Sequence, residues 1–164
     1  METTEKAETA GKPFVIPMEE IPPFYLGSLQ LPIVAHDHRR TIYELNFPKH
    51  SWQGFRIYHP DPLGNHYHLD KAERFHILKG KACLATRRVF PEWRSTGVEV
   101  MDVDETTVVI EILPGVAHAF SFIFDNFGEM KDAKSILESA AVMLCWSSAP
   151  FDPKKMDMAP WKLL

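Results

Sequence analysis

The sequence predicts an all-β protein folded as one domain, a sandwich or barrel of short strands. Thirteen prolines and eight glycines in 164 residues divide the chain into short elements. Apolar residues recur at alternate positions in several segments, which is the period of a strand with one buried face. Aromatic residues make up 12% of the chain and pack well on pleated sheets. The length allows one ordinary domain with a single sizeable core.

The first residues differ from the rest of the chain. Residues 1–12 are polar, and we expect a disordered tail there, followed by one domain over residues 13–164. From Phe14 to Pro32 four prolines exclude a helix and favour extended edge segments that lie over the sheet.

The remaining elements are predicted from alternation and from turn residues. In Thr41–Phe47, Tyr43 and Leu45 share one face and Glu44 lies on the other. Only Glu129–Glu138 has a helical pattern, so at most one short helix is expected near the C-terminus. The predicted strands are Thr41–Phe47, Trp52–Tyr58, a strand through His66–His68, Arg74–Leu78, Ala82–Phe90, Glu99–Val103, Thr106–Leu113, Ala117–Phe124 and Ala140–Trp146.

Charge and cysteine content limit the possible partners and compartment. The formal charge of −4 and the pI of about 6.0 give no general attraction for phosphate backbones, so we expect no nucleic-acid partner. Cys83 and Cys145 are not in a CxxC arrangement and are interpreted as core thiols in a reducing compartment. No secretory signal and no apolar run of about 20 residues is visible, which predicts a cytoplasmic protein without a membrane partner.

One segment carries metal-binding chemistry. His66 and His68 are two positions apart on a predicted strand, so both side chains project to the same face. Glu73 follows a short turn and can reach the same point from the next strand, and the turn Pro114–Gly115 leads to a further histidine, His118. Three imidazoles and one carboxylate predict one divalent ion, Fe, Mn, Ni, Co or Zn, with two open positions on an octahedral ion. The other histidines are interpreted as structural or surface residues, with His38 and His59 the first exceptions to consider.

These two segments resemble the two signature motifs of the cupin superfamily. The first motif, G(x)5HxH(x)3-4E(x)6G, matches at His66, His68, Glu73 and Gly80, although Gly64 stands only two residues before the first histidine. The second motif matches at its glycine and histidine, but its proline is displaced by one place and a phenylalanine replaces its asparagine. The resemblance implies a jelly-roll β-barrel with the metal inside, and the departures fall outside the ligand positions.

Within the cupins, the chain is similar to the dTDP-sugar 3,5-epimerases. The matching segments are Asp37 to Glu44, Leu63 to Tyr67, Pro114 to Phe120 and Phe151-Asp152-Pro153. Two departures count against the epimerase activity itself: His68 stands where that family has a glutamine, and the late strand around Cys145 lacks its catalytic tyrosine. The HYH…ERF…KG run also resembles the HYH…EKF…KG run in the metal-binding cupin module of some capsule-sugar reductases.

Three functions remain open at this stage. The first is a metal-dependent isomerase or epimerase acting on a small carbohydrate or nucleotide-sugar; the alternatives are a non-haem iron dioxygenase of small molecules and a non-catalytic metal-dependent binding protein. Arg39 and Arg40 are candidate substrate-binding residues, since guanidinium groups suit phosphate oxygens. A homodimer is expected by analogy with other cupins. The candidate catalytic residues are Tyr67, Tyr58, Glu44 and His59.

Overall fold

The computed structural model describes residues 11–150 and 158–164, and its elements confirm the all-β prediction. Residues 1–10 of the expected tail and the segment Phe151-Asp152-Pro153 lie outside the described residues. The strands are β1 Phe24–Leu26, β2 Leu29–Leu31, β3 Ile33–His36, β4 Arg40–Asn46, β5 Ser51–Ile57, β6 Leu63–His68, β7 Glu73–Lys79, β8 Lys81–Arg88, β9 Glu99–Asp104, β10 Ile110–Ile112, β11 Val116–Phe122, β12 Ala141–Ser147 and β13 Met158–Pro160. One α-helix, α1, spans Ala133–Ser139, and three-residue 3-10 helices span Met18–Glu20, Glu92–Arg94 and Phe127–Glu129.

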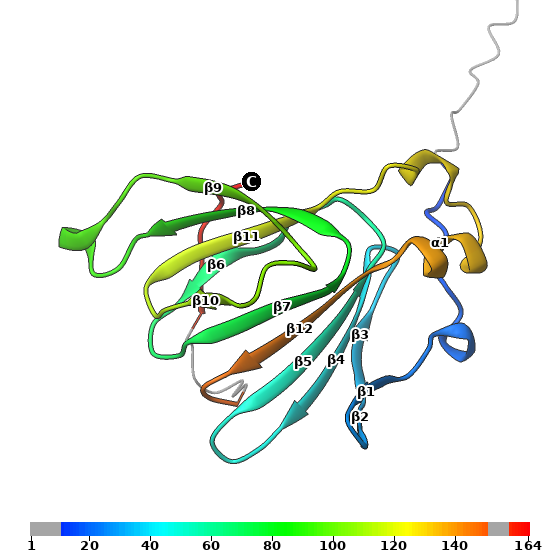
Figure 1. Cartoon of the computed structure of the whole chain (residues 1–164), viewed down its shortest axis with the longest axis horizontal. Helices are drawn as coiled ribbons and strands as arrows, with labels where there is room; N and C mark the ends of the chain where they lie inside the picture. Colours follow the sequence, from blue (N-terminus) through cyan, green and yellow to red (C-terminus); the bar gives the residue numbers. More distant parts are fainter. Residues whose placement is uncertain (1–10, 151–157) are drawn as a thin grey trace, which may run out of the picture.

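Two antiparallel sheets face each other (Figure 1). The six-stranded sheet has the order β10-β7-β12-β5-β4-β3, and the five-stranded sheet has the order β13-β6-β11-β8-β9. A separate hairpin, β1–β2, lies beside β4 and β5. The candidate metal ligands on β6, β7 and β11 come from both layers, since β7 belongs to the six-stranded sheet and the other two to the five-stranded one.

The two sheets are not closed into the predicted barrel. The edge strand β10 is only three residues long, whereas the sequence predicts a strand over Thr106–Leu113. Asp104 Oδ1 accepts hydrogen bonds from the Thr106 backbone N–H (2.8 Å) and hydroxyl (2.6 Å), and Thr107 Oγ1 accepts one from the Asp104 N–H (3.1 Å). These local bonds form a turn that takes the place of the first residues of the predicted strand.

A first core fills the space between the sheets. The alternation on β7 is observed as predicted, since Phe75 and Ile77 are buried and His76 is only half-buried. Burying these apolar side chains is the main stabilising contribution that holds the sheets together. The buried members are Ile57, Leu63, Phe75, Ile77, Ala82, Leu84, Val103, Ile110, Ile112, Phe120, Phe122, Ala141, Met143 and Cys145.

A second core lies on the outer face of the six-stranded sheet, under β1, β2 and α1 (Figure 1). Tyr43 of β4 belongs to this outer core, so the alternate residues of β4, Arg40 and Ile42, face the other sheet. The proline-rich N-terminal segment is therefore more than an extended cover, because it supplies a hairpin and a 3-10 turn. The buried members are Ile16, Ile21, Phe24, Leu31, Tyr43, Tyr58, Ile136, Ala140 and Leu144.

The helix is shorter than the predicted range Glu129–Glu138. Asp132 is extended, and its side chain accepts a hydrogen bond from the Ser135 N–H at 2.7 Å, while the Ser135 hydroxyl lies 3.3 Å from the Asp132 N–H. This reciprocal capping box starts the helix at Ala133. A side chain on the resulting helix, Ile136, is then buried in the outer core.

Candidate metal centre

Strands β6 and β11 place two histidines directly opposite each other. His66 pairs with His118 in the antiparallel ladder, and the register shifts immediately afterwards between His118 and Ala119. The two rings are 4.8 Å apart between centroids. Opposed residues of an antiparallel pair point to the same face, so the pairing alone brings both imidazoles to one place.

Two glycines near these histidines allow close contacts between backbone segments. Gly64 has φ +99°, and a Cβ there would lie 2.6 Å from the carbonyl oxygen of His118. Gly115 has φ +80°, and a Cβ there would lie 2.0 Å from the carbonyl oxygen of Phe90. The Gly115 N–H donates a 2.7 Å hydrogen bond to the carbonyl of His68, which ties the Pro-Gly turn to the end of β6.

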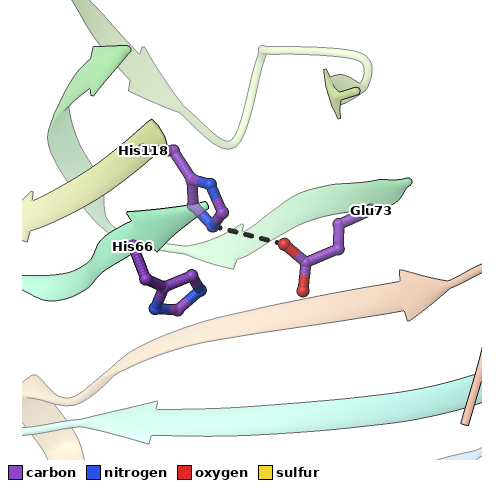
Figure 2. Close-up of side chains that lie close together, drawn as sticks. All are labelled: His66, Glu73 and His118. Carbon is purple, nitrogen blue, oxygen red and sulfur yellow. Dashed lines mark ion pairs between the residues drawn. The ribbon is translucent and has the colours of Figure 1, made fainter. Parts of the chain in front are cut away.

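Glu73 reaches the same place from the six-stranded sheet. It is the first residue of β7, and reciprocal hydrogen bonds between Ala72 and Ser148 hold the chain just before it. Its Oε2 lies 3.2 Å from His118 Nε2 and 3.3 Å from His68 Nε2. Figure 2 shows the carboxylate of Glu73 directed at the rings of His118 and His66 from the opposite layer.

The structure brings together three of the four predicted ligands as one group. Side-chain ligand atoms of His66, Glu73 and His118 all lie within 4.8 Å of one another. His68 is also buried, its ring centroid is 4.9 Å from that of His66, and its Nε2 lies 3.3 Å from Glu73 Oε2. His68 therefore lies beside the group of three, against its carboxylate.

Burial sets the protonation of this cluster. Burial, together with the rings of His118 and His68, lowers the pKa of His66 to about 4, so His66 is neutral near pH 7. Burial by itself would raise the pKa of Glu73, but the rings of His118 and His68 outweigh it and hold that pKa well below its usual range. A neutral imidazole and an ionised carboxylate are the forms in which these side chains bind metals.

The chemistry of the cluster fits a divalent metal ion. Glu73 is 4% exposed, and within the described part of the chain its Oε2 is a buried oxygen that receives no hydrogen bond of acceptable geometry. A buried carboxylate is costly unless a cation or hydrogen bonds compensate its charge. Imidazole nitrogens and a carboxylate oxygen are ligands that Fe, Mn, Co, Ni and Zn share.

The cluster opens into a cavity of about 420 Å³ between the two sheets. This volume is within the range of small-molecule sites. The walls are mostly apolar, and the polar residues on them other than the cluster are Arg40 and Gln53. The lining residues are Arg40, Ile42, Gln53, Phe55, Leu63, Gly64, His66, Glu73, Phe75, His118, Phe120 and Met143.

The two candidate substrate-binding arginines have different surroundings. Arg39 donates to Asp37 Oδ2 from Nε (3.2 Å) and Nη2 (2.9 Å), in an ion pair outside the cavity wall. Arg40 is partly buried and lines the cavity. Burial and the nearby charge of Arg39 lower the pKa of Arg40, but a guanidinium group stays protonated and can only donate hydrogen bonds.

The four candidate catalytic residues lie outside the cavity lining. Tyr58 is buried in the outer core, where its hydroxyl is 2.7 Å from Thr41 Oγ1 and burial raises its pKa to about 12. Tyr67 alternates with the histidines of β6 and faces Trp161 on the other side of its sheet. His59 packs at the protein surface against His38 and Phe127 and accepts a hydrogen bond from the Asp61 N–H. Glu44 accepts a hydrogen bond from Gln53, which itself lines the cavity.

Gln53 is a cavity residue that the sequence reasoning missed. Within Trp52–Tyr58, the positions Gln53, Phe55 and Ile57 alternate with the outward-facing ones. Period-two reading of this strand could have placed Gln53 on the same face as Phe55. The pattern did not distinguish that face from the outer one, because both faces of the six-stranded sheet are covered by apolar cores.

The two facing antiparallel sheets, with histidines and a carboxylate converging between them, define a cupin fold. Residues 36–159 match the family described as the polysaccharide biosynthesis C-terminal domain, and the chain belongs to that family. A comparison with curated proteins finds no match.

Solved structures share the fold at low sequence identity. The capsular polysaccharide assembling protein CapF from Staphylococcus aureus aligns with a TM-score of 0.64 and 20% identity over 80% of this chain and 35% of CapF. NovW, a 4-keto-6-deoxy sugar epimerase from Streptomyces spheroides, aligns with a TM-score of 0.51 and 14% identity over 66% of this chain and 49% of its own. Oxalate decarboxylase from Bacillus subtilis, in a structure at pH 4.6, aligns with a TM-score of 0.51 and 16% identity over 74% of this chain and 28% of its own.

The chain thus spans about a third of CapF and about half of NovW. These likenesses establish the fold. Within the described residues, no helix is long and apolar enough to cross a membrane.

Proposed function

We propose that this protein is a metal-dependent cupin that binds a small carbohydrate or nucleotide-sugar and catalyses isomerase- or epimerase-type chemistry on it. The observation that carries the proposal is the buried cluster of His66, Glu73 and His118, which opens into an apolar cavity that also holds Arg40. A cluster of this kind supplies a fixed reaction centre, and the cavity supplies room for a small polar ligand beside it.

We assign one divalent ion to this cluster, with His66, Glu73 and His118 as ligands and His68 as the fourth. Iron, manganese, nickel, cobalt and zinc all suit this donor set. When bound, such an ion would polarise a carbonyl or hydroxyl oxygen of the ligand. His68 Nε2 is 3.3 Å from Glu73 Oε2, which places this nitrogen beside a ligand oxygen.

The substrate class rests on the family and on two of the structures. The family is described by polysaccharide biosynthesis, CapF by capsular polysaccharide assembly, and NovW by 4-keto-6-deoxy sugar epimerisation. A cavity of about 420 Å³ holds a sugar ring more readily than a complete nucleotide-sugar, so a nucleotide would extend beyond it. The family description and the descriptions of the two structures therefore share carbohydrate as the class of ligand.

Residues of the chain have definable tasks in this scheme. Arg40 would hold an anionic or carbonyl oxygen of the ligand by donated hydrogen bonds. Phe55, Phe75 and Phe120 exclude water from the reacting part of the sugar and strengthen every polar contact there. Arg39 is paired with Asp37 and lies outside the cavity lining. It therefore serves as the control for substitutions of Arg40.

Exchange of substrate protons with solvent tests the activity. A nucleotide-linked 4-keto-6-deoxyhexose carries acidic protons at C3 and C5, next to the carbonyl, and epimerisation requires their removal. We expect the metal-loaded protein to exchange at least one of these protons for deuterium in D2O, with the exchange monitored by NMR. Arg40→Ala should slow exchange at least about tenfold, whereas Arg39→Ala should stay within about twofold of wild type. Tight binding of the sugar without any exchange would contradict an epimerase.

A non-catalytic binding module is the second candidate. The observation that favours it is that, among the cavity-lining residues, the ionisable groups are Arg40 and the members of the metal cluster. A proton-transfer reaction normally needs an acid or base within hydrogen-bond reach of the substrate. Metal-dependent sugar binding without solvent exchange is the outcome that would select this function.

We also propose that the protein forms a homodimer. The edge strand β9 exposes Val100 (61% exposed) and Met101 (44% exposed), and Val98 beside it is also exposed. An edge strand with exposed apolar side chains offers unpaired backbone groups to a second copy. Light scattering on the purified protein should give twice the mass of one chain, and a single-chain mass at micromolar concentration would refute the dimer.

A further inference from the structure

A polar pair stands at the edge of the cavity on the six-stranded sheet. Glu44 of β4 and Gln53 of β5 are direct cross-strand partners, and Gln53 Nε2 donates a 2.8 Å hydrogen bond to Glu44 Oε1. The other carboxylate oxygen, Oε2, lies 3.4 Å from Asn46 Nδ2. Gln53 lines the cavity, whereas Glu44 lies beside Gln53 and outside the lining. The carboxylate is thus held at both oxygens by neighbouring amides.

This contact determines which way round the Gln53 amide lies. A carboxylate accepts and cannot donate, so the –NH2 end of Gln53 must face Glu44. The carbonyl oxygen is then the end of the amide that remains for a ligand. Among the described residues no hydrogen bond to that oxygen is formed. Gln53 therefore offers an oriented acceptor to the cavity.

Arg40 offers the opposite kind of group on the same face of the sheet. Its guanidinium can only donate hydrogen bonds. Between Arg40 and the Glu44–Gln53 pair stands the apolar cross-strand pair of Ile42 and Phe55, both of which line the cavity. Arg40 and Glu44 are four residues apart, or about 13 Å along an extended strand. The wall thus presents a donor at one end, an acceptor at the other, and apolar surface in between.

We infer that Gln53 is a specificity-determining residue that accepts a hydrogen bond from one hydroxyl of the sugar, and that Glu44 is a positioning residue that fixes its amide. This inference rests on the proposed function, because it concerns the ligand of the same cavity. The ligand class it names is a sugar whose one end carries a hydroxyl donor and whose other end carries anionic or carbonyl oxygens for Arg40. A ligand without that hydroxyl leaves the Gln53 carbonyl without a donor.

The test measures binding of dTDP-glucose and its 2-, 3-, 4- and 6-deoxyglucose analogues to the metal-loaded protein by calorimetry. We expect one of the analogues to bind at least about fivefold more weakly than dTDP-glucose, the cost of one hydrogen bond. In Gln53→Ala that difference should vanish, because the acceptor is gone. Gln30→Ala, at an exposed position of β2, is the matched control and should keep the discrimination of wild type.

The role of Glu44 is tested with two substitutions. Glu44→Ala leaves the Gln53 amide free to rotate, so the discrimination between dTDP-glucose and the selected analogue should fall about threefold or more. Glu44→Gln should restore it, because its carbonyl can still accept from Gln53. A residue that only stabilised the fold would change all affinities together and leave the ratio unchanged.

The outcomes separate this inference from the proposed function. Equal binding of dTDP-glucose and all four analogues would overturn the role of Gln53 while leaving a carbohydrate cupin intact. Selective binding without deuterium exchange would overturn only the epimerase chemistry. If neither dTDP-glucose nor any analogue binds at millimolar concentration, both the inference and the nucleotide-sugar proposal fail.

Discussion

At Gly64 the backbone of β6 passes so close to β11 that a side chain has no room. A Cβ would lie 2.6 Å from the carbonyl oxygen of His118, and the residue has φ +99°. The same two strands carry His66 and His118, which face each other one step away. The spacing of the two imidazoles therefore depends on the absence of a side chain at this position.

Gly64→Ala should lower both stability and metal affinity. The backbone strain of an alanine at positive φ costs about 1–3 kcal/mol, and the contact with His118 adds to it. We expect a loss of unfolding free energy of at least about 2 kcal/mol, measured by urea denaturation, and weaker metal binding by calorimetry.

Gly27 provides the matched control for this substitution. It also has positive φ (+61°), but a Cβ there would meet no atom within 4 Å. Gly27→Ala should therefore show the backbone cost alone, with metal affinity unchanged. If the two alanine variants behave alike, the close approach at Gly64 has no part in forming the cluster.

Individual residues of the cluster were predictable, but their environment was not. His66 and His68 share a face by the period of a strand, and the distant Pro114–Gly115 turn marks His118. The separate surroundings of Arg39 and Arg40 involve Asp37, whose carboxylate pairs with the guanidinium of Arg39, whereas the side chain of Arg40 lines the cavity. The Gln53 contribution depends on the register of β5 against β4, which local sequence does not determine.

At the scale of elements, strand β6 is supported on its outer side by the C-terminal strand β13. Pro160 pairs with His66, and the Trp161 N–H donates to the carbonyl of Asn65 at 2.7 Å. Asn65 has φ +56°, and its side-chain oxygen accepts from the Leu163 N–H (2.7 Å) and the Leu164 N–H (3.1 Å). The strand that carries two histidines is therefore fastened to a segment far along the chain.

Asn65→Gly should loosen this fastening without straining the backbone, because glycine accepts positive φ. We expect hydrogen exchange of the Leu163 and Leu164 amides to accelerate about fivefold or more, as each loses a hydrogen bond. NMR-detected exchange gives the measurement.

Asn65→Asp keeps an oxygen for both amides and should preserve their protection. The Trp161 amide bonds to the backbone of residue 65 and should change little in either variant. Unchanged exchange at both leucines in the glycine variant would show that the side chain of Asn65 does not hold the C-terminal segment.

Most of the predicted elements lie within two residues of the observed ends, because alternation and Pro or Gly turns mark them, whereas the short strands β1, β2, β3 and β13 were not predicted as strands. The exceptions among the predicted elements have local causes. Asp104 bonds to the two threonines that follow it and shortens the predicted strand Thr106–Leu113 to β10. Asp132 caps α1 and delays its start. Side-chain hydrogen bonds to nearby backbone groups compete with the backbone hydrogen bonds of helices and strands, and composition alone does not show which of the two forms.

For the whole molecule, the all-β class was predictable and the closure of the sheets was not. Turn density and alternation indicate a two-layer β fold. Whether its edges join depends on contacts between strands distant in sequence, such as β9 and β10 with the opposite layer. The outer core under β1, β2 and α1 was also not predicted. An amphipathic pattern shows that one face of an element is buried, but it does not show against which apolar layer that face packs.

The whole arrangement places two histidines from one sheet against a glutamate from the other. The five-stranded sheet supplies the histidines and the six-stranded sheet supplies the carboxylate, so the full ligand set is assembled only when both layers pack together. Metal binding should therefore stabilise the assembled fold, since an ion that binds the native state alone shifts the unfolding equilibrium.

A crystal structure of the metal-loaded protein, with anomalous difference maps above and below the absorption edge of the ion, tests this account most directly. We expect one anomalous peak between the sheets, about 2.0–2.6 Å from a nitrogen of His66, a nitrogen of His118 and an oxygen of Glu73. A peak elsewhere, or no peak in protein that retains a full equivalent of metal, would contradict the central claim.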